Sequence, residues 1–435
     1  MTKAIHETTS EIAIAGEYDV VVCGGGMAGC GAAITAARQG AQVLLIERLE
    51  MLGGLGSAGW VGNFCAAEGG LRGQGRVFDE ILAALYENDA TGEENGWRVK
   101  HNRKYQRVNQ TFDHRYLPLV LQQLVLDAGA TILYATDIVG AENENGRIKS
   151  VMIHNRSLLQ RIMGKVFIDT TGDGILSRHA GGAPLPDDPQ FPGVIKPSNM
   201  MLMRKTERQI PPPEADPRCT DGSEPDYSVW PDVEGQAALK MKLFDRLLDT
   251  STGQGYSDSV ITMRREQPHF AAHFRRNHDP SYVYAGAAPM LGLRESSRIE
   301  GDHVLTIDEC RAGQCFSDSV AYGTFTVDAN RTAEILPPYQ IPLRSLTVKK
   351  VDNCLVAGRC FSADRLALSS ARTMATACLM GQAAGIAAAL AASTNRAIRQ
   401  VDTADIRARL LDGAKDADLM DKRLRPKEEG NAESE

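Results

Sequence analysis

The chain has 435 residues, of which 43% are hydrophobic and 24% charged, and a formal net charge of −7. Because single hydrophobic cores stop growing at roughly 250 to 300 residues, we expect two domains. The acidic balance argues against nucleic acid as a partner. The nine cysteines contain no Cys-x-x-Cys pair, which favours reduced cytoplasmic thiols over a zinc or iron–sulfur site.

Residues 1–16 have no cationic start followed by a long apolar core, so they are expected to be a disordered lead rather than a signal peptide. The stretch from Tyr18 to Glu47 is then the most informative of the chain. An apolar β-branched run enters Gly24-x-Gly26-x-x-Gly29, an alanine-rich helical segment follows, and a second apolar run ends on Glu47. This order predicts a βαβ dinucleotide-binding unit.

Each glycine of this unit has a physical role. Gly24 permits the tight turn from strand to helix, Gly26 lets the backbone approach a pyrophosphate, and Gly29 allows close packing of helix on strand. The pyrophosphate is expected at the helix N-terminus. Glu47 is placed to accept hydrogen bonds from ribose hydroxyls, which disfavours a 2′-phosphate. The motif alone does not separate NAD from FAD.

The next elements alternate between helix and strand. Five glycines between positions 53 and 62 indicate backbone lying close to a bulky group. Helical spacing follows at Val77–Tyr86, a polar irregular segment at Thr91–Gln110, and a helix at Arg115–Ala128. A strand meander then turns at Asn145-Gly146 and ends in Val166–Asp169, which runs into Thr-Thr-Gly-Asp-Gly.

Proline and acidic residues dominate after Ala183, which predicts a crossover into a second domain. We therefore expect a cofactor domain in residues 17–182 and 339–395, a smaller α+β substrate domain in 183–338, and a C-terminal helix with a disordered tail in 396–435. The run Ala375–Ala392 is long and apolar, but its small residues favour a buried helix over a membrane span.

Several separated segments carry a resemblance to one family. They are GGGMAGCGAA with LLIER and LGG after it, LGLRESSRIEGDHVLT, FIDTTGDGILSRHAG, and LVAGRCFSADRLALSSARTMATACLMGQAAG. The sequence resembles FAD-dependent oxidoreductases with a glutathione-reductase-type FAD fold, distantly similar to fumarate reductase and succinate dehydrogenase flavoproteins. The resemblance implies an α/β fold in which a Rossmann-like FAD-binding domain, a parallel sheet with a β-meander, carries the smaller substrate domain.

The resemblance also implies which residues hold FAD. The pyrophosphate falls to the three glycines, the ribose to Glu47, and the adenine to the backbone of Val139. Asp173 and Gly358 are expected near the pyrophosphate and ribitol, and the helix after Arg372 points its N-terminus at the flavin N1 edge, where reduced flavin carries negative charge. The implied FAD site comprises Gly24, Gly26, Met27, Ala28, Gly29, Glu47, Arg48, Gly54, Val139, Asp173, Gly358 and Arg372.

Some relatives attach FAD covalently through a histidine soon after the first unit. The segment after Glu47 has no histidine before His101, so non-covalent FAD is expected. The segment Asp173–Arg178 also resembles aromatic-ring monooxygenases, but Gly358-Arg359-Cys360 stands where those enzymes have a Gly-Asp-Ala-Ala-His type ending. A monooxygenase therefore remains an alternative.

The candidate catalytic residues are Arg294 and Glu295, in the segment that the resemblance places facing the flavin. They are equally interpretable as a structural ion pair, because buried carboxylates and guanidiniums usually pair. His269 and His273 have helical i, i+4 spacing without a third ligand, so a solvated basic face is favoured over a metal site. Cys65 and Cys360 are interpreted as packing thiols.

The leading hypothesis is oxidation of a C–OH or C–NH bond of a small polar substrate, with hydride transfer to flavin N5. An ene reductase or dehydrogenase acting on a carboxylated C–C bond is a second hypothesis, and a non-catalytic or RNA-modifying module is disfavoured by acidity. An anionic substrate is suggested by a set of arginines: Arg98, Arg103, Arg264, Arg265, Arg294 and Arg298. The electron acceptor is unknown, and homo-oligomerisation stays open.

Overall fold

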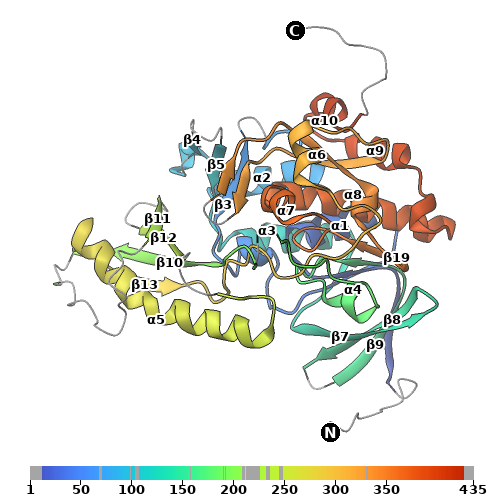
Figure 1. Cartoon of the computed structure of the whole chain (residues 1–435), viewed down its shortest axis with the longest axis horizontal. Coiled ribbons are helices and arrows are strands. Elements are labelled where there is room, and N and C mark those ends of the chain that lie inside the picture. Colours follow the sequence, from blue (N-terminus) through green and yellow to red (C-terminus); the bar gives the residue numbers. More distant parts are fainter. Residues whose placement is uncertain are drawn as a thin grey trace.

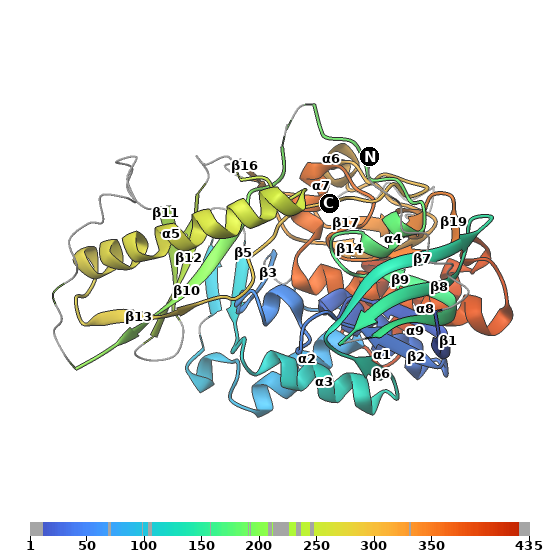
Figure 2. The same ribbon diagram turned by 90° about the horizontal axis from the view of Figure 1, so that it is seen from below.

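The computed structural model describes residues 12–67, 71–97, 99–102, 107–156, 158–189, 191, 193–207, 211, 226–231, 236–243, 248–329 and 332–425. These residues form a large α/β body from which a smaller sheet and one long helix project to one side (Figures 1 and 2). This arrangement confirms the expected α/β fold class.

The large body is built on one mainly parallel sheet. Its parallel strands lie in the order β19, β9, β1, β2 and β6, which span Val351–Val356, Leu158–Asp169, Ile14–Cys23, Val43–Ile46 and Thr131–Leu133. In the register, Val20 of β1 lies between Val43 of β2 and Val166 of β9. These strands are apolar and buried on both faces at the centre, as expected for a parallel sheet covered on both sides.

A β-meander extends from the same sheet. Strands β7 (Thr136–Glu144) and β8 (Arg147–Asn155) pair antiparallel, and β8 pairs with the first half of β9. Asn145 and Gly146 have φ angles of 52° and 82°, the left-handed conformation that the predicted tight turn needs. On the other edge, the short strand β18 (Thr347–Val348) pairs antiparallel with β19.

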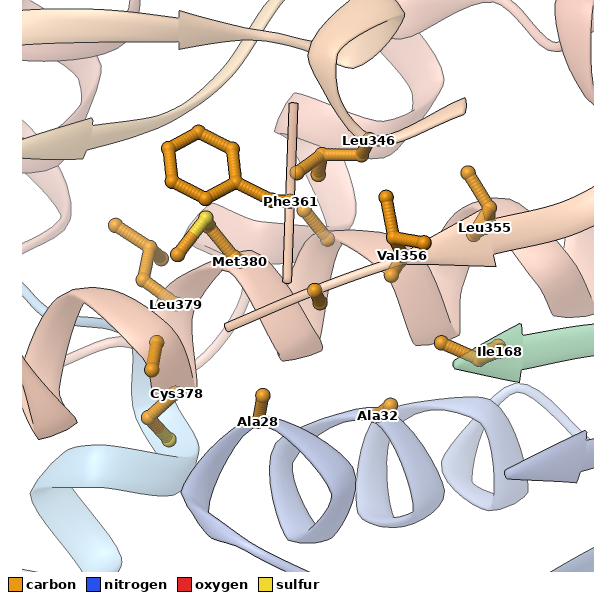
Figure 3. Packing of buried hydrophobic residues seen from close by; sticks show 14 of the residues in the cluster. Ala28, Ala32, Ile168, Leu346, Leu355, Val356, Phe361, Cys378, Leu379 and Met380 are labelled. Carbon is orange, nitrogen blue, oxygen red and sulfur yellow. The ribbon is translucent and has the colours of Figure 1, made fainter. Parts of the chain in front are cut away.

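Two helices of small residues pack together against this sheet. They are α1 (Met27–Arg38) and α8 (Met374–Thr394), and Figure 3 shows Ala28 and Ala32 of α1 facing α8. A Cβ atom at Gly381 would lie 2.0 Å from the carbonyl oxygen of Ala28, so the two backbones are as close as glycine permits. In the described part of the chain α8 is the one helix long and apolar enough to cross a membrane, and most of it is buried in this fold.

The remaining helices of the body are α2 (Arg76–Glu87), α3 (Leu117–Asp127), α4 (Ile175–His179), α6 (Ile307–Ala312), α7 (Arg365–Ala371), α9 (Thr403–Leu411) and α10 (Ala417–Leu424). Helices α2, α3 and α9 lie where the sequence predicts helices. Helix α10 departs from the expected disordered tail, because its Met420 and Leu424 are buried in the main core. Residues 1–11 and 426–435, where disorder was also expected, lie outside the described residues.

The segment expected to be irregular instead contributes to a small sheet. Strand β5 (Arg107–Thr111) pairs with β3 (Asn63–Ala67) and with β4 (Val99–Asn102). The polar residues of this segment contain no apolar run that would have indicated a strand. Two further antiparallel pairs join β14 (Ser319–Gly323) to β17 (Tyr339–Pro342) and β15 (Val327–Ala329) to β16 (Thr332–Glu334).

The projecting lobe consists of a four-stranded antiparallel sheet in the order β11, β12, β10 and β13 (Asp226–Pro231, Gln236–Lys242, Ser198–Lys205 and Tyr282–Ala287). Helix α5 (Gly253–Asn277) covers one face of this sheet through Phe270 and Phe274. In contrast, Ile299, Leu305 and Tyr322 belong to the core of the large body. The second domain boundary near Pro338 therefore stays a prediction, and the packing favours an earlier return of the chain.

Candidate functional site

One cavity lies at the carboxyl edge of the parallel sheet. Strands β1, β2, β9 and β19 all end there, which is where α/β sheets bind ligands. The residues that follow these four strands and line the cavity are Gly24, Gly26, Glu47, Arg48, Thr170, Thr171, Gly172, Ala357, Gly358 and Arg359.

The N-terminus of α1 opens into this cavity. Gly26 is its N-cap, no side chain caps the helix, and a Cβ at Gly26 would meet no atom within 4 Å. Met27 and Ala28 in the first turn also line the cavity. The helix therefore presents uncapped backbone N–H groups and its positive dipole end to open space, which suits an anion such as a pyrophosphate.

Two neighbouring glycines fix this geometry. Gly24 has a φ of 108°, in the region that favours glycine. Gly29 does not line the cavity. A Cβ at Gly29 would lie 1.8 Å from the carbonyl oxygen of Gly24, so only glycine fits there. It allows the helix to start directly against the strand, as its position in the motif suggested. Gly54, in the short helix Gly54–Gly56, approaches the Cα of Gly26 across the cavity.

Glu47 lies at the tip of β2 with its carboxylate buried. Its Oε2 accepts a hydrogen bond from the N–H of Gly25 at 2.6 Å and its Oε1 accepts one from the N–H of Leu49 at 2.8 Å. Burial raises the pKa of this carboxyl, and the two backbone bonds oppose the rise. The side chain thus ties the glycine turn to the end of β2 while lining the cavity.

The strand expected to meet the adenine lies beside the cavity. Thr136, Asp137 and Ile138 of β7 line it, whereas the side chain of Val139 is 42% exposed and does not. The contact of the Val139 backbone with the adenine therefore stays a prediction.

A compact polar network shapes the turn after β9. Asp169 is fully buried and accepts hydrogen bonds from Thr171 and Ser177, with both N–H groups and both hydroxyls donating. Asp173 lies just behind the cavity lining and pairs with Arg359 Nη2 at 2.9 Å and with the Ser296 hydroxyl at 2.5 Å. Burial alone would raise the pKa of Asp173, but the charge of Arg359 and the hydroxyl bond lower it overall.

Arg372 also lines the cavity, and it directly precedes Thr373, the N-cap of α8. Its Nη2 donates to the backbone oxygen of Asp328 at 3.1 Å and lies 3.3 Å from its carboxylate. Its Nε is buried and has no hydrogen-bond partner among the described residues. Burial lowers the pKa of Arg372 to about 10, against the attraction of Asp328. Such a buried donor can be satisfied by a water molecule or by a ligand atom.

The structure does not pair Arg294 with Glu295. Glu295 is 2% exposed; its carboxylate lies 3.0 Å from Arg298 Nε and 2.7 Å from Arg365 Nε, and also accepts from the N–H of Ile195. The Arg294 guanidinium donates to the backbone oxygen of Lys196. Neither side chain lines the cavity. The expectation that Glu295 fixes Arg294 is corrected: i, i+3 spacing and the buried Arg365 give it closer cations.

The structure does not bring the other candidate cations together at the cavity. Arg264 and Arg265 are exposed on α5, and Arg98 and Arg103 lie outside the described residues. His273 on α5 is within 3.1 Å of the Tyr227 hydroxyl, so it packs against the lobe's own sheet. Among the described residues no group of three or more His, Cys, Asp or Glu side chains could hold a metal.

Sequence reasoning missed Lys240, Asp328 and Arg359. Burial lowers the pKa of both Lys240 and Arg294, and the charges of Asp328 and Cys65 oppose the fall. The alternation of apolar and polar residues in Gln236–Lys242 was the one sequence signal that could have placed Lys240 on a strand. Arg359 was visible only as the residue that replaces a known motif ending.

The fold and this cavity define an α/β protein with an uncapped helix N-terminus and a buried acid, Glu47, at the carboxyl edge of its parallel sheet. The chain belongs to the FAD dependent oxidoreductase family, whose model matches residues 19–186 and 194–410. It is therefore an FAD-dependent oxidoreductase, and FAD is its cofactor.

Solved structures with similar arrangements are distant in sequence. A geranylgeranyl bacteriochlorophyll reductase-like protein from Thermoplasma acidophilum is 16% identical over 94% of this chain and 84% of its own, with a TM-score of 0.46. A myxobacterial chondrochloren halogenase is 11% identical over 95% and 87%, with a TM-score of 0.49. The anhydrotetracycline hydroxylase of Streptomyces rimosus is 13% identical over 94% and 68%, with a TM-score of 0.47.

Proposed function

We propose that this enzyme oxidises a C–OH or C–NH bond of a small anionic substrate by transferring a hydride to the flavin. The supporting observation is a pair of buried arginines at and next to the cavity. Arg372 lines it, Arg294 follows the lining residue Leu293 and is 5% exposed, and the charge of Asp328 acts on both guanidiniums. A carboxylate on the substrate would suit these planar guanidinium groups.

The residues around the cavity fit FAD. The N-terminus of α1 would hold the pyrophosphate, Glu47 the adenosine ribose, and the N-terminus of α8 with Arg372 the pyrimidine edge of the flavin. Bound FAD supplies an acceptor for hydride at N5. The helix dipole and the unpartnered Nε of Arg372 would favour the negative charge of the reduced form.

Anaerobic reduction of the bound flavin by a panel of metabolites tests this proposal. The panel pairs each hydroxy or amino acid with its neutral amide or alcohol analogue. We expect loss of flavin absorbance near 450 nm, as for flavoproteins in general, with an acid and about 100-fold slower loss with its analogue. Reduction by neutral compounds as fast as by acids would overturn the anionic substrate.

The two alternative reactions appear as other outcomes of the same experiment. An ene reductase or dehydrogenase acting on a carboxylated C–C bond would be reduced by saturated acids that carry no hydroxyl or amino group. A monooxygenase would be reduced by a nicotinamide cofactor and would then consume oxygen when its substrate is added. Either result would overturn C–OH or C–NH oxidation.

A further inference from the structure

Arg359 brings a positive charge to the part of the cavity where a pyrophosphate is expected. It follows Gly358 at the carboxyl end of β19 and lines the cavity. A Cβ at Gly358 would lie 3.2 Å from the Cβ of Ala28, which is in the first turn of α1. Arg359 therefore directly follows backbone that packs on the start of this helix, whose N-terminus favours an anion.

The guanidinium of Arg359 is held in place before any ligand binds. Its Nη1 donates to the Ser296 hydroxyl at 2.7 Å, and its Nη2 donates to Asp173 Oδ1 at 2.9 Å. Gly172 lies against Nη2, because a Cβ at that position would be only 2.7 Å away. Since just 13% of the side chain is exposed, Arg359 has little freedom left to lose when a ligand binds.

Arg359 still has donors to offer to the cavity. A guanidinium carries more N–H groups than these two hydrogen bonds use, and the side chain makes no other hydrogen bond with the described residues. Asp173, the carboxylate that pairs with it, does not line the cavity. An anion bound there would therefore meet the cation of this pair and not its carboxylate.

We propose that Arg359 donates hydrogen bonds to the pyrophosphate of FAD and supplies a fixed positive charge beside the N-terminus of α1. The planar fork of a guanidinium matches the spacing of phosphate oxygens, and a hydrogen bond between charged groups is stronger than one between neutral groups. This inference rests on FAD as the cofactor and is independent of the reaction proposed above.

Titration of FAD into the apoprotein is the first test. Arg359→Met should raise the dissociation constant by about 10- to 100-fold, the value of a hydrogen bond to a charged group. Arg359→Lys keeps the charge but loses the fork, so its effect should be smaller.

Arg161→Met is the matched control for this titration. Arg161 pairs with Glu142 at 3.3 Å and its side chain is 15% exposed, but it does not line the cavity. Its dissociation constant for FAD should stay within about twofold of the wild type. An equal loss of affinity in Arg359→Met and Arg161→Met would overturn the proposal.

Removing both members of the pair separates phosphate binding from a purely structural role. Arg359→Met leaves the Asp173 carboxylate without its cation, which destabilises the turn after β9. Arg359→Met/Asp173→Asn removes that charge as well, so urea unfolding should show a stability closer to the wild type. The affinity for FAD should remain as low as in Arg359→Met. Recovery of affinity together with stability would show that Arg359 only holds Asp173 and would overturn the proposal.

Two further measurements identify the group that Arg359 contacts. The dissociation constant of FAD should rise with salt concentration less steeply in Arg359→Met than in the wild type, because the variant lacks a charge pair that salt screens. In the ³¹P NMR spectrum of bound FAD, Arg359→Lys should shift the pyrophosphate signals and Arg161→Met should not. Unchanged signals in Arg359→Lys would place the guanidinium away from the phosphates and overturn the proposal.

The outcomes also keep this inference apart from the proposed function. If Arg359→Met binds FAD like the wild type but needs more acid for the same rate of flavin reduction, Arg359 binds the substrate and the proposal is wrong. Failure of every hydroxy and amino acid to reduce the wild-type flavin would overturn the proposed function and leave the role of Arg359 standing.

Discussion

Glu47 already has two backbone partners before a ribose is bound, and this determines what its replacement does. Gln at position 47 offers one oxygen where Gly25 and Leu49 donate to two. We expect Glu47→Gln to weaken FAD binding by roughly 1.5 to 3 kcal/mol, the value of a hydrogen bond to a charged group. Titration of FAD into the apoprotein measures this change. Glu50→Gln, at an exposed position in the same loop, is the control, and an equal affinity in both variants would contradict the prediction.

Glu295 is a residue whose contacts favour a structural role. Glu295→Gln removes the carboxylate between Arg298 and Arg365, leaving two buried guanidiniums with fewer partners. Breaking a buried ion pair costs about 3 to 5 kcal/mol. Urea unfolding should therefore show a loss of this size, together with reduced FAD retention.

Glu300→Gln provides the matched control for Glu295. Glu300 pairs with Lys349 at a more exposed position, and surface pairs contribute about 0 to 1 kcal/mol. If Glu295→Gln instead keeps wild-type stability and FAD content but its flavin is reduced about 100-fold more slowly, Glu295 acts as the base and the structural role is wrong.

At the scale of elements, the βαβ unit was predictable because its constraints are local. Strand, glycine turn, helix and terminal acid follow one another within thirty residues, and Gly24, Gly29 and Glu47 make contacts within that segment. Strand β5 was missed because its pairing with β3 joins distant segments, and polar residues gave no apolar run. Helix α10 was missed because Met420 and Leu424 gain their burial only from the large body.

The α1–α8 contact explains why an apolar helix without charged residues is buried rather than lipid-exposed. Gly381 and Gly385 allow α8 to touch the backbone of α1, and Thr35 Oγ1 donates to the Gln382 carbonyl oxygen at 3.0 Å. Such contact needs glycine on one helix and small residues on the other, a pattern that the composition of Ala375–Ala392 indicated.

Gly381→Ala should therefore destabilise the fold although alanine is the better helix former. The added Cβ would lie 2.0 Å from the Ala28 carbonyl oxygen, and backbone cannot move aside as a flexible side chain can. We expect a loss of at least about 1 to 3 kcal/mol in urea unfolding. Gly253→Ala, at the open start of α5, should be neutral or stabilising by up to about 1 kcal/mol. Equal effects at both positions would contradict the packing argument.

At the scale of the whole molecule, the cofactor cavity draws on residues that are far apart in the chain. Gly26 and Glu47 come from its beginning, Met290 and Leu293 from the connection after the lobe, and Arg372 from the final third. The motifs identified those parts of the site that lie within a single segment of the sequence. The sequence did not place Asp328 near Arg372, because that contact joins residues far apart in the chain that no periodic pattern relates.

Since these segments meet only in the folded chain, FAD should bind the native state and not the unfolded one. We expect FAD added to the apoprotein at 100 times its dissociation constant to stabilise the fold by about 2.7 kcal/mol. Urea unfolding with and without FAD measures this shift, and riboflavin at the same concentration is the control because it lacks the pyrophosphate and ribose. Equal stabilisation by riboflavin would show that the N-terminus of α1 and Glu47 contribute nothing.

If the cofactor is held only by these contacts, acid precipitation should leave a colourless pellet and free FAD in the supernatant. Flavin retained in the pellet would show a covalent bond.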